Sequence, residues 1–418
     1  MQRVADQIRR RWGVGALAFT ILVACGSPTP QEPLSFAPVP DATPAKPDGA
    51  LRVATFNVAL YNPDRAGGLI AELELDNHRR TDAIKAIIDS VNPDILVVNE
   101  IDYDPDGRAL DLFADLIDGG YGYRFALPSN TGVASWVDLD GDGRNDHAPG
   151  SQEYGNDAFG FGRFPGQYAF GVVSRFPINE AAIRTFQNFL WKDLPDNLMP
   201  TDFYSEDAQE IFRLSSKTHA DVPIDINGQT LHFVLAHPTP PGFDGREDRN
   251  GRRNHDEIRL LHDYITDHDA TWLIDDNGMS GGLSSDAFFV IAGDLNADPV
   301  DGDRVDGVSR HAIADLIGSS RVVDPQPHST GGSDAAYEQG DANLGHDGDH
   351  TLDTGDFSDQ RVGNLRVDYV LPSSNLEVLA SGTFWPAPGE PGFELVGPGY
   401  PVVSSDHRLV WVDIRLPE

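Results

Sequence analysis

Runs of apolar residues, separated by polar segments, recur along most of the chain and predict buried strands. Continuous apolar runs of this kind are typical of strands that are covered on both faces of a sheet. We expect strands within residues 51–60, 94–102, 168–178, 212–226, 229–237, 288–296, 365–372 and 404–416. The dipeptide Asn227-Gly228 joins two of these runs and predicts a tight hairpin turn between them.

Two other segments place their apolar residues at the spacing of a helix. These positions are Ala83, Ile84, Ile87 and Ile88 within residues 81–90, and Ile258, Leu261 and Ile265 within residues 254–267. The order strand, helix, strand at the start of this series is typical of a layered α/β domain. Because strands continue to the last residues and no internal repeat is found, we expect one domain over residues 50–418.

The start of the chain has the pattern of an export signal. Arg9, Arg10 and Arg11 precede an apolar stretch over residues 13–24, which is shorter than the about 20 apolar residues of a membrane-spanning helix. The stretch ends at Cys25, the only cysteine of the chain. This arrangement resembles a bacterial lipoprotein signal, in which the cysteine is lipidated. The alternative is an ordinary signal peptide with an incidental cysteine.

Residues 26–49 are rich in proline and poor in charged residues, a composition that favours an extended tether over a packed element. A signal peptide over residues 1–25 followed by this tether predicts an exported, membrane-anchored lipoprotein at the outer membrane, in the periplasm or on the cell surface. The domain over residues 50–418 then lies beyond the tether, and we expect it to be a monomer.

The charge of the chain narrows the choice of partners. The formal net charge is −35 at pH 7, with 66 acidic and 31 basic residues. Such a charge repels the phosphates of nucleic acids, and the basic surface expected of a duplex-binding protein is not evident. Divalent cations can offset this repulsion locally, so nucleic acid is disfavoured as a partner rather than excluded.

Polar residues mark the ends of six apolar runs, and this repetition is the main functional signal in the sequence. The residues are Asn57, Glu100, His237, Asp294 with Asn296, Asp368, and Asp406 with His407. The stretch FFVIAGDLN alone is equally compatible with a turn, since Gly, Asp and Asn are turn residues. In a continuing strand, Asp294 and Asn296 point the same way at the carboxyl end, where open α/β sheets bind ligands. Six such strand exits predict a shared active site.

Six pieces of the chain, in this order, resemble the motifs of the endonuclease/exonuclease/phosphatase superfamily. The pieces are TFNV, VVNEI, LAHPTPP, AGDLNADP, LRVDYVLPS and SSDHRLV, and they span most of residues 51–418. The resemblance implies the deoxyribonuclease I-like fold, an α/β four-layer sandwich of two mixed β-sheets flanked by helices. It also implies a metal-dependent phosphoric ester hydrolase.

The resemblance further implies which residues bind a metal. Asn57, Glu100 and Asp406 would hold a divalent cation, Mg²⁺ or Mn²⁺, with Glu100 as the main ligand. Oxygen ligands suit these hard ions, which also take phosphate oxygens directly. The family commonly has glutamine before this glutamate, whereas Asn99 stands here, and this departure affects the expected phosphate contacts.

The catalytic residues are implied in the same way. His407, oriented by Asp368, would act as general base on a water or position the water and the phosphate. Asp294 would hold or deprotonate the nucleophilic water, and Asn296 and His237 would donate hydrogen bonds to phosphate oxygens. The reaction would be an in-line attack on a phosphoester, with the cation and the donors neutralising the developing charge.

The acidic segment DLDGDGRND, residues 138–146, has the spacing of an EF-hand-like calcium loop. The predicted Ca²⁺ ligands are Asp138, Asp140, Asp142 and Asp146. Pro149 stands where such a loop needs a glutamate, and no flanking helices are evident. An acidic turn without an ion is therefore the alternative.

Two basic groups leave their roles open. The first is Arg246, Arg249, Arg252 and Arg253, which either bind substrate phosphate or pair with the acidic residues around them. The second is Lys217 and His219, which either add phosphate ligands or form one face of an exposed hairpin.

The main functional hypothesis is an exported, metal-dependent phosphoesterase that acts on small phosphodiesters or phosphomonoesters. A secreted nonspecific nuclease of the same fold is the first alternative, and a calcium-dependent surface binding module with a vestigial site is the second. The segments 103–167 and 331–360 are long for the family and lie where substrate-selecting loops usually sit, so the substrate stays undetermined.

Overall fold

The computed structural model describes residues 36–75 and 79–417. The predicted signal peptide with Cys25, and the first part of the predicted tether, lie outside the described residues. The described residues belong to one compact unit. Within them, no helix combines the length and the apolar composition needed to cross a membrane.

The first sheet contains six strands and one parallel pair. Its order is β12 (Glu377–Thr383), β13 (Val410–Arg415), β1 (Leu51–Leu60), β2 (Ile95–Ile101), β4 (Phe170–Ser174) and β3 (Tyr123–Leu127). Strands β1 and β2 are parallel, and the other neighbouring pairs are antiparallel. All ten residues of β1 are buried, which explains why its sequence lacks an alternation of apolar and polar positions.

The second sheet contains five strands and also has one parallel pair. Its order is β11 (Asp368–Pro372), β8 (Phe288–Asp294), β7 (Gln229–Ala236), β6 (His219–Ile226) and β5 (Arg184–Thr185). Strands β7 and β8 are parallel, and the remaining neighbours are antiparallel. A separate short pair joins β9 (Gly355–Asp356) to β10 (Asn364–Leu365).

The predicted hairpin turn is confirmed. Asn227 and Gly228 join β6 to β7 and have φ values of 55° and 91°. Positive φ at both central residues is what a tight turn between right-twisted strands requires, and it is why this dipeptide is a reliable signal.

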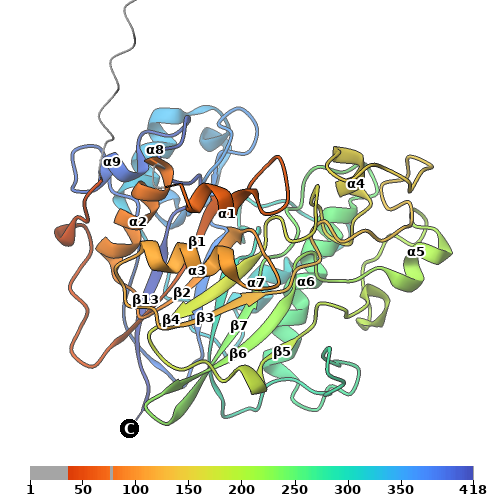
Figure 1. Cartoon of the computed structure of the whole chain (residues 1–418), viewed down its shortest axis with the longest axis horizontal. Coiled ribbons are helices and arrows are strands. Elements are labelled where there is room, and N and C mark those ends of the chain that lie inside the picture. The colour runs from red at the N-terminus through yellow and green to blue at the C-terminus, as the bar shows by residue number, and fades with distance from the viewer. Residues whose placement is uncertain (1–35, 76–78, 418) are drawn as a thin grey trace, which may run out of the picture. The chain divides into compact units, whose positions relative to one another are not determined.

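Helices cover the outer faces of both sheets (Figure 1). The helices of the described residues are α1 (Gly68–Leu73), α2 (Arg79–Val91), α3 (Arg108–Leu116), α4 (Gln152–Asn156), α5 (Glu206–Ile211), α6 (Arg249–Thr266), α7 (Ala312–Ile317), α8 (Thr330–Gln339) and α9 (Phe393–Val396). Buried residues of α2 and α3 pack against the first sheet. Those of α6 and α7 pack against the second.

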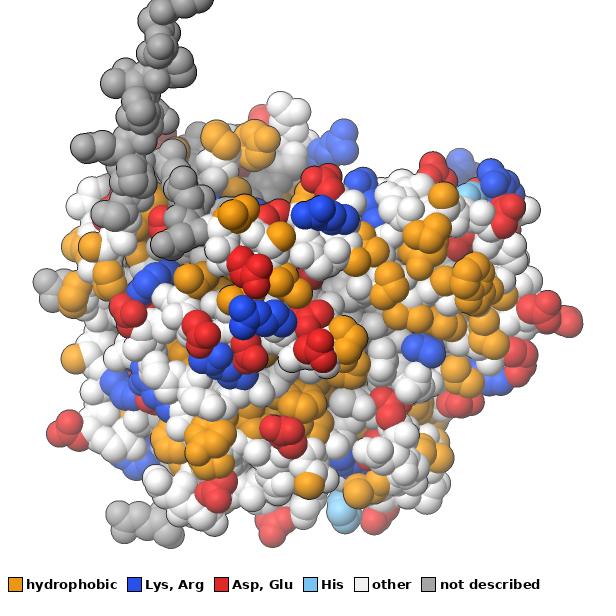
Figure 2. Space-filling view, in the orientation of Figure 1, with side chains coloured by type: hydrophobic (Ala, Val, Ile, Leu, Met, Phe, Trp, Pro, Cys, Tyr) orange, Lys and Arg blue, Asp and Glu red, His pale blue; other side chains and the backbone are white. Residues whose placement is uncertain are grey.

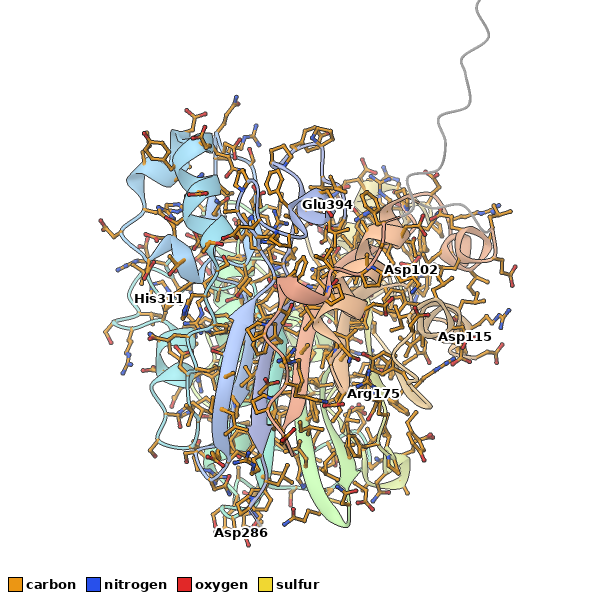
Figure 3. The ribbon with its side chains drawn as sticks, turned by 90° about the vertical axis from the view of Figure 1, so that its left-hand side faces the viewer. Asp102, Asp115, Arg175, Asp286, His311 and Glu394 are labelled. Atoms are coloured by element: carbon orange, nitrogen blue, oxygen red, sulfur yellow. The ribbon has the colours of Figure 1, made fainter. Side chains whose placement is uncertain are left out.

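A third apolar cluster lies between the two sheets. Val53 and Val97 of the first sheet share this cluster with Phe233 and Val290 of the second. The sheets therefore pack face to face with helices outside, which confirms the four-layer sandwich. Figure 3, turned by 90° from Figure 1, shows the strands side by side with the N-terminal helices along one side.

Two predicted elements have different bounds in the structure. The strand expected over residues 212–226 begins only at His219, because the preceding segment binds elsewhere; Ser216, for example, donates its backbone N–H to Glu257 at 2.6 Å. Helix α6 begins at Arg249 rather than at residue 254. Its first turns bury polar side chains such as Arg253, so they lack the apolar stripe that reveals a helix in sequence.

Candidate active site

The predicted polar residues meet at one edge of the two sheets, but not all of them follow a strand. Asp368 is the first residue of β11, and Asp406 and His407 precede β13. The prediction of six strand exits is therefore wrong for these two runs. Strand β11 runs antiparallel to β8, so its amino end meets the carboxyl end of β8, and Asp368 pairs in register with Asp294.

Asp294 is the centre of the cluster and is only 1% exposed. Its Oδ2 accepts a hydrogen bond from Nδ2 of Asn57 at 3.0 Å and lies 3.4 Å from Nε2 of His237 and 3.7 Å from Nε2 of His407. Burial raises the pKa of Asp294 to about 6, although the neighbouring His407 acts in the opposite direction. Four predicted site residues are thus in mutual contact around one carboxylate.

His407 and Asp368 form a buried pair. Nδ1 of His407 lies 2.9 Å from Oδ2 of Asp368, which also accepts a hydrogen bond from the Thr354 hydroxyl at 2.9 Å. Burial alone lowers the pKa of His407, but the carboxylates of Asp368 and Asp294 raise it well above the usual value. Since Nδ1 is engaged by a carboxylate, Nε2 is the atom that faces Asp294.

His237 is held in its neutral form. The side chain is buried, its Nδ1 has no hydrogen-bond partner, and its Nε2 faces Asp294. Burial and the charge of Lys217 hold the pKa of His237 well below the usual value. A neutral imidazole can donate one hydrogen bond without adding positive charge.

Asn296 reaches the site from a turn rather than from a strand. Strand β8 ends at Asp294, and Asn296 has a φ of 49°, so the strand alternation expected for this pair does not extend to it. The backbone N–H of Asn296 donates to Oδ1 of Asp294 at 2.9 Å, and its amide donates to the Pro238 carbonyl at 3.2 Å. The stretch is therefore a turn and also part of the site, because the turn places Asn296 beside Asp294.

Gly293 allows β7 and β8 to come together at this point. It has a φ of 151°, and a Cβ atom at this position would stand 2.1 Å from the carbonyl oxygen of Ala236. Only glycine fits so close an approach of backbone, which explains the glycine directly before Asp294.

Glu100 and Asp406 lie in the same charged region. Glu100 lies near the carboxyl end of β2, and its backbone has a left-handed conformation with φ 57°. Burial raises the pKa of Glu100, and the carboxylates of Asp406 and Asp294 raise it further. A carboxylate whose pKa is raised by neighbouring carboxylates favours a bound cation, and oxygen donors suit a hard divalent ion.

Within the active-site cluster, Asp294, Asp368 and His407 are close enough to share an ion directly, since their ligand atoms lie within 4.8 Å of one another. Hydrogen bonding between His407 and Asp368 already occupies two of these atoms. Glu100 and Asp406 do not belong to this group. The chemistry of the oxygen donors around Glu100 nevertheless fits a divalent cation.

The four predicted Ca²⁺ ligands of the acidic loop do not all lie together in the structure. Asp138 and Asp140 lie together with Asp157, within 4.8 Å, whereas Asp142 and Asp146 are not part of this group. Asp146 instead forms an exposed ion pair with Arg144 at 2.9 Å.

The structure decides between the two interpretations of Lys217 and His219. Lys217 and His219 are buried, so the alternative of an exposed hairpin face is wrong. His219 bonds to Ser215 and to the Glu257 carbonyl, whereas the pKa of Lys217 is lowered by burial and raised by Glu257, Glu100 and Asp294.

Two of the four clustered arginines interact with other groups of the protein. Arg253 is buried and donates to the carbonyl of Leu214 at 2.8 Å, and Arg249 pairs with Glu247. These two arginines support the pairing and packing interpretation.

Sequence reasoning missed two hydroxyl groups of the site. Thr354 fixes Asp368, and Ser405 donates to the carbonyl of Asn57 at 2.7 Å while accepting the N–H of His407 at 3.1 Å. Ser405 stands next to the Asp-His pair in sequence, and that adjacency was an available signal. Thr354 lies in a Gly- and Asp-rich loop and has no local signal.

Several solved structures are similar to this chain. An endonuclease/exonuclease/phosphatase from Beutenbergia cavernae DSM 12333 is 19% identical, with 88% of this chain and 72% of that chain covered and a TM-score of 0.47. A family protein from Leptotrichia buccalis C-1013-b is 15% identical, with 88% and 100% covered and a TM-score of 0.45. Sphingomyelinase C from Streptomyces griseocarneus is 16% identical, with 89% and 99% covered and a TM-score of 0.43.

Comparison with curated proteins gives no match. The model of the Endonuclease/Exonuclease/phosphatase family, in contrast, matches residues 54–407, which include all of the predicted catalytic and metal-binding residues. Because this match covers most of the chain, the protein belongs to the endonuclease/exonuclease/phosphatase family and is a metal-dependent phosphoric ester hydrolase.

Proposed function

We propose that this protein is an exported phosphoesterase that hydrolyses small phosphodiesters or phosphomonoesters by in-line attack of water. The main support is the group of side chains around the buried carboxylate of Asp294, which are Asn57, His237 and His407. Asp368 contacts Nδ1 of His407 and so orients Nε2 toward Asp294. A buried carboxylate with several donors and an oriented imidazole is suited to activating water.

His407 is the proposed general base. Its Nδ1–H donates to Asp368, so Nε2 is free to take a proton from a water held beside Asp294. The carboxylates that raise the pKa of His407 also stabilise the imidazolium that forms when the proton arrives.

Asp294 is the proposed holder of the nucleophilic water. Asn57 and the backbone N–H of Asn296 fix its two oxygens at 3.0 Å and 2.9 Å, so the carboxylate does not need to reorient during the reaction. His237 and Asn296 are the proposed donors to the phosphate oxygens. The nearby charge of Lys217 adds to the attraction for a phosphate.

The proposed metal ligands are Asn57, Glu100 and Asp406, with Mg²⁺ or Mn²⁺ as the ion. When bound, such an ion neutralises charge that develops on the phosphate and leaving-group oxygens. The charge of Asp406 and Asp294 next to Glu100 supports a cation in this region.

A small substrate is supported by the charges around the site. A cleft beside Asn296 is lined also by His255, Asp303, Arg304, Arg310 and His311, of which Figure 3 labels His311. Elsewhere, on the face in Figure 2, Lys and Arg side chains are interspersed with Asp and Glu rather than gathered into one basic patch. Local basic groups in a chain of net charge −35 favour a compact phosphoester over a nucleic acid duplex.

Turnover of chromogenic substrates tests the proposal. The purified protein is expected to hydrolyse bis-p-nitrophenyl phosphate or p-nitrophenyl phosphate with Mg²⁺ or Mn²⁺, to lose this activity in EDTA and to lose it in Asp294→Asn. Plasmid DNA and RNA form a second arm. Absence of turnover on every phosphoester with several metals would contradict the proposed activity, and faster cleavage of DNA or RNA would contradict the proposed substrate.

Export and anchoring are a separate part of the proposal. Cys25 follows an apolar stretch and precedes a proline-rich segment, and this order supports lipidation. Cys25→Ser is expected to move the protein from the membrane fraction to the soluble fraction without a change in specific activity. A wild-type protein that is already soluble, or a mature N-terminus other than Cys25, would refute lipidation.

A further inference from the structure

The acidic loop lies at the tip of an insert that reaches the active site. Isolated bridges pair Thr131 with Gly160 and Ala134 with Ala158, so the loop over residues 138–146 closes the end of a hairpin-like insert near α4 (Figure 1). At its base, the backbone N–H of Asn130 donates to the carbonyl of Lys217 at 2.9 Å. The insert therefore forms part of the structure around Lys217.

Asp157 brings a buried carboxylate to this loop from a different segment. It follows α4 and is 6% exposed, and its Oδ1 accepts the backbone N–H of Leu139 at 2.8 Å. Its Oδ2 is buried and has no hydrogen-bond partner. Asp157 belongs to a group with Asp138 and Asp140 in which one ligand atom of each residue lies within 4.8 Å of the others.

The charge of this group is not balanced by lysine or arginine. Within residues 36–75 and 79–417, Arg144 forms an ion pair with Asp146 instead, and none reaches the three clustered carboxylates. The imidazole of His147 lies close by, with Nε2 3.5 Å from Asp157 and 3.2 Å from Asp142, but this nitrogen makes no hydrogen bond. A buried oxygen without a donor next to two further carboxylates is an unfavourable arrangement unless a cation joins it.

We propose that Asp138, Asp140 and Asp157 bind a structural Ca²⁺ ion that fastens the insert. Ca²⁺ accepts carboxylate oxygens from separate segments in a flexible geometry, whereas Mg²⁺ demands a regular octahedron. The ligand set differs from the EF-hand spacing in the sequence, because Asp157 replaces Asp146 as the carboxylate that closes the site. The site lies apart from the catalytic cluster, and its occupancy is independent of the proposed reaction.

Direct binding measurements test this site. After EDTA treatment and removal of the chelator, calorimetric titration of Ca²⁺ in the presence of saturating Mg²⁺ is expected to show one site, with a dissociation constant on the order of 10⁻⁴ M. Terbium provides a second readout, because the exposed Trp136 lies beside the loop, where its carbonyl accepts the Asn145 amide at 2.8 Å. Excitation of tryptophan is expected to produce terbium luminescence that Ca²⁺ quenches by competition.

Matched variants separate this site from other acidic groups. Asp157→Asn is expected to weaken Ca²⁺ binding by at least about tenfold and to remove the rise in melting temperature that Ca²⁺ gives the wild type. Asp140→Asn is the second variant, because Asp140 is less buried and its loss is easier for the fold to tolerate. Asp146→Asn, in the same loop but outside the group, is expected to bind Ca²⁺ as the wild type does.

Two outcomes would overturn the proposal. In the first, the wild type shows no Ca²⁺ heat and no terbium luminescence, which would mean that His147 or solvent balances the carboxylates. In the second, Asp157→Asn and Asp140→Asn bind Ca²⁺ with wild-type affinity. Neither result depends on phosphoesterase activity, so failure of this site is distinguishable from failure of the proposed function.

Discussion

Replacement of Asp368 by asparagine is the sharpest perturbation of the proposed chemistry. Asp368 is 1% exposed, His407 is 5% exposed, and their atoms are 2.9 Å apart. Asparagine keeps the size of the side chain and a carbonyl acceptor for the Thr354 hydroxyl, but it removes the negative charge that faces the imidazole. The variant therefore tests orientation and charge without leaving a cavity.

The magnitude follows from the burial of the pair. Breaking a buried ion pair by removing one partner costs about 3–5 kcal/mol. At about 1.4 kcal/mol for each tenfold change in rate, a transition state that carries this loss is reached about 10² to 10⁴ times more slowly. We therefore expect kcat to fall in this range, measured with a p-nitrophenyl ester under saturating substrate and Mg²⁺ or Mn²⁺.

The pH profile provides a readout that a structural role would not change. Burial lowers the pKa of His407 and Asp368 raises it, so loss of the Asp368 charge lowers the pKa. A general base works in its neutral form, and the rate rises as pH rises through its pKa. The rising limb of the profile is therefore expected at lower pH in Asp368→Asn than in the wild type.

Asp221→Asn is the matched control for this experiment. Asp221 on β6 is 2% exposed and lies 2.9 Å from Nδ1 of His232 on β7, so the two form an aspartate–histidine pair with a similar distance. We expect the folded control to keep wild-type kcat and its pH profile. Wild-type turnover in folded Asp368→Asn, or an equal loss in Asp221→Asn, would refute the assignment of His407 as the oriented base.

Three further substitutions test the hydrogen-bond donor to Asp294, the close backbone approach of β7 and β8, and the buried acid Asp102. Asn57→Ala removes the 3.0 Å donor to Asp294, and since a hydrogen bond to a charged group contributes about 1.5–3 kcal/mol, kcat is expected to fall by about 10- to 100-fold in the same assay. Gly293→Ala places a Cβ 2.1 Å from the Ala236 carbonyl and is expected to cost roughly 2–5 kcal/mol in urea unfolding; an unchanged midpoint would contradict the close approach of β7 and β8. Asp102, labelled in Figure 3, has its pKa raised from 3.8 to about 7 by burial, so the folded state binds its proton more tightly and stability is lost as pH rises through this interval. The free energy of unfolding of Asp102→Asn is therefore expected to rise relative to that of the wild type between pH 5 and pH 8. The difference amounts to about 1.4 kcal/mol per unit of pKa difference and is on the order of 4 kcal/mol at most. If the two proteins showed the same dependence of stability on pH, this carboxyl would not titrate in the folded state.

The strands were predictable where burial on both faces leaves no polar position. Strand β1 is buried throughout and spans the predicted run over residues 51–60, although Asn57 was expected to end it. Helix α6 was predicted only from residue 254 onward, because its first turn buries Arg253 against carbonyl groups of loops that are distant in sequence. Periodicity detects an apolar stripe, and it does not detect a helix face that is buried through hydrogen bonds.

The site residues that could be predicted from the sequence are those that stand at the end or the beginning of an apolar run. Asp157 was not predicted as a member of its group, and the role of Lys217 was left open, for the same physical reason. Each acquires its role from a partner in another segment, Asp157 from the loop at Asp138 and Lys217 from the carboxylates of Glu100 and Asp294. Spacing along one segment cannot reveal such a contact.

The hydrogen bonds of the site cross from one sheet to the other, and this links catalysis to the core. Asn57 on β1 donates to Asp294 on β8, and His407, before β13, bonds to Asp368 on β11. The apolar cluster between the sheets, which includes Val53 and other strand residues, therefore sets the spacing of both contacts. Because displacement by about 1 Å can cost about 10²-fold in rate, a change of volume in this core alters activity even where no catalytic residue is touched.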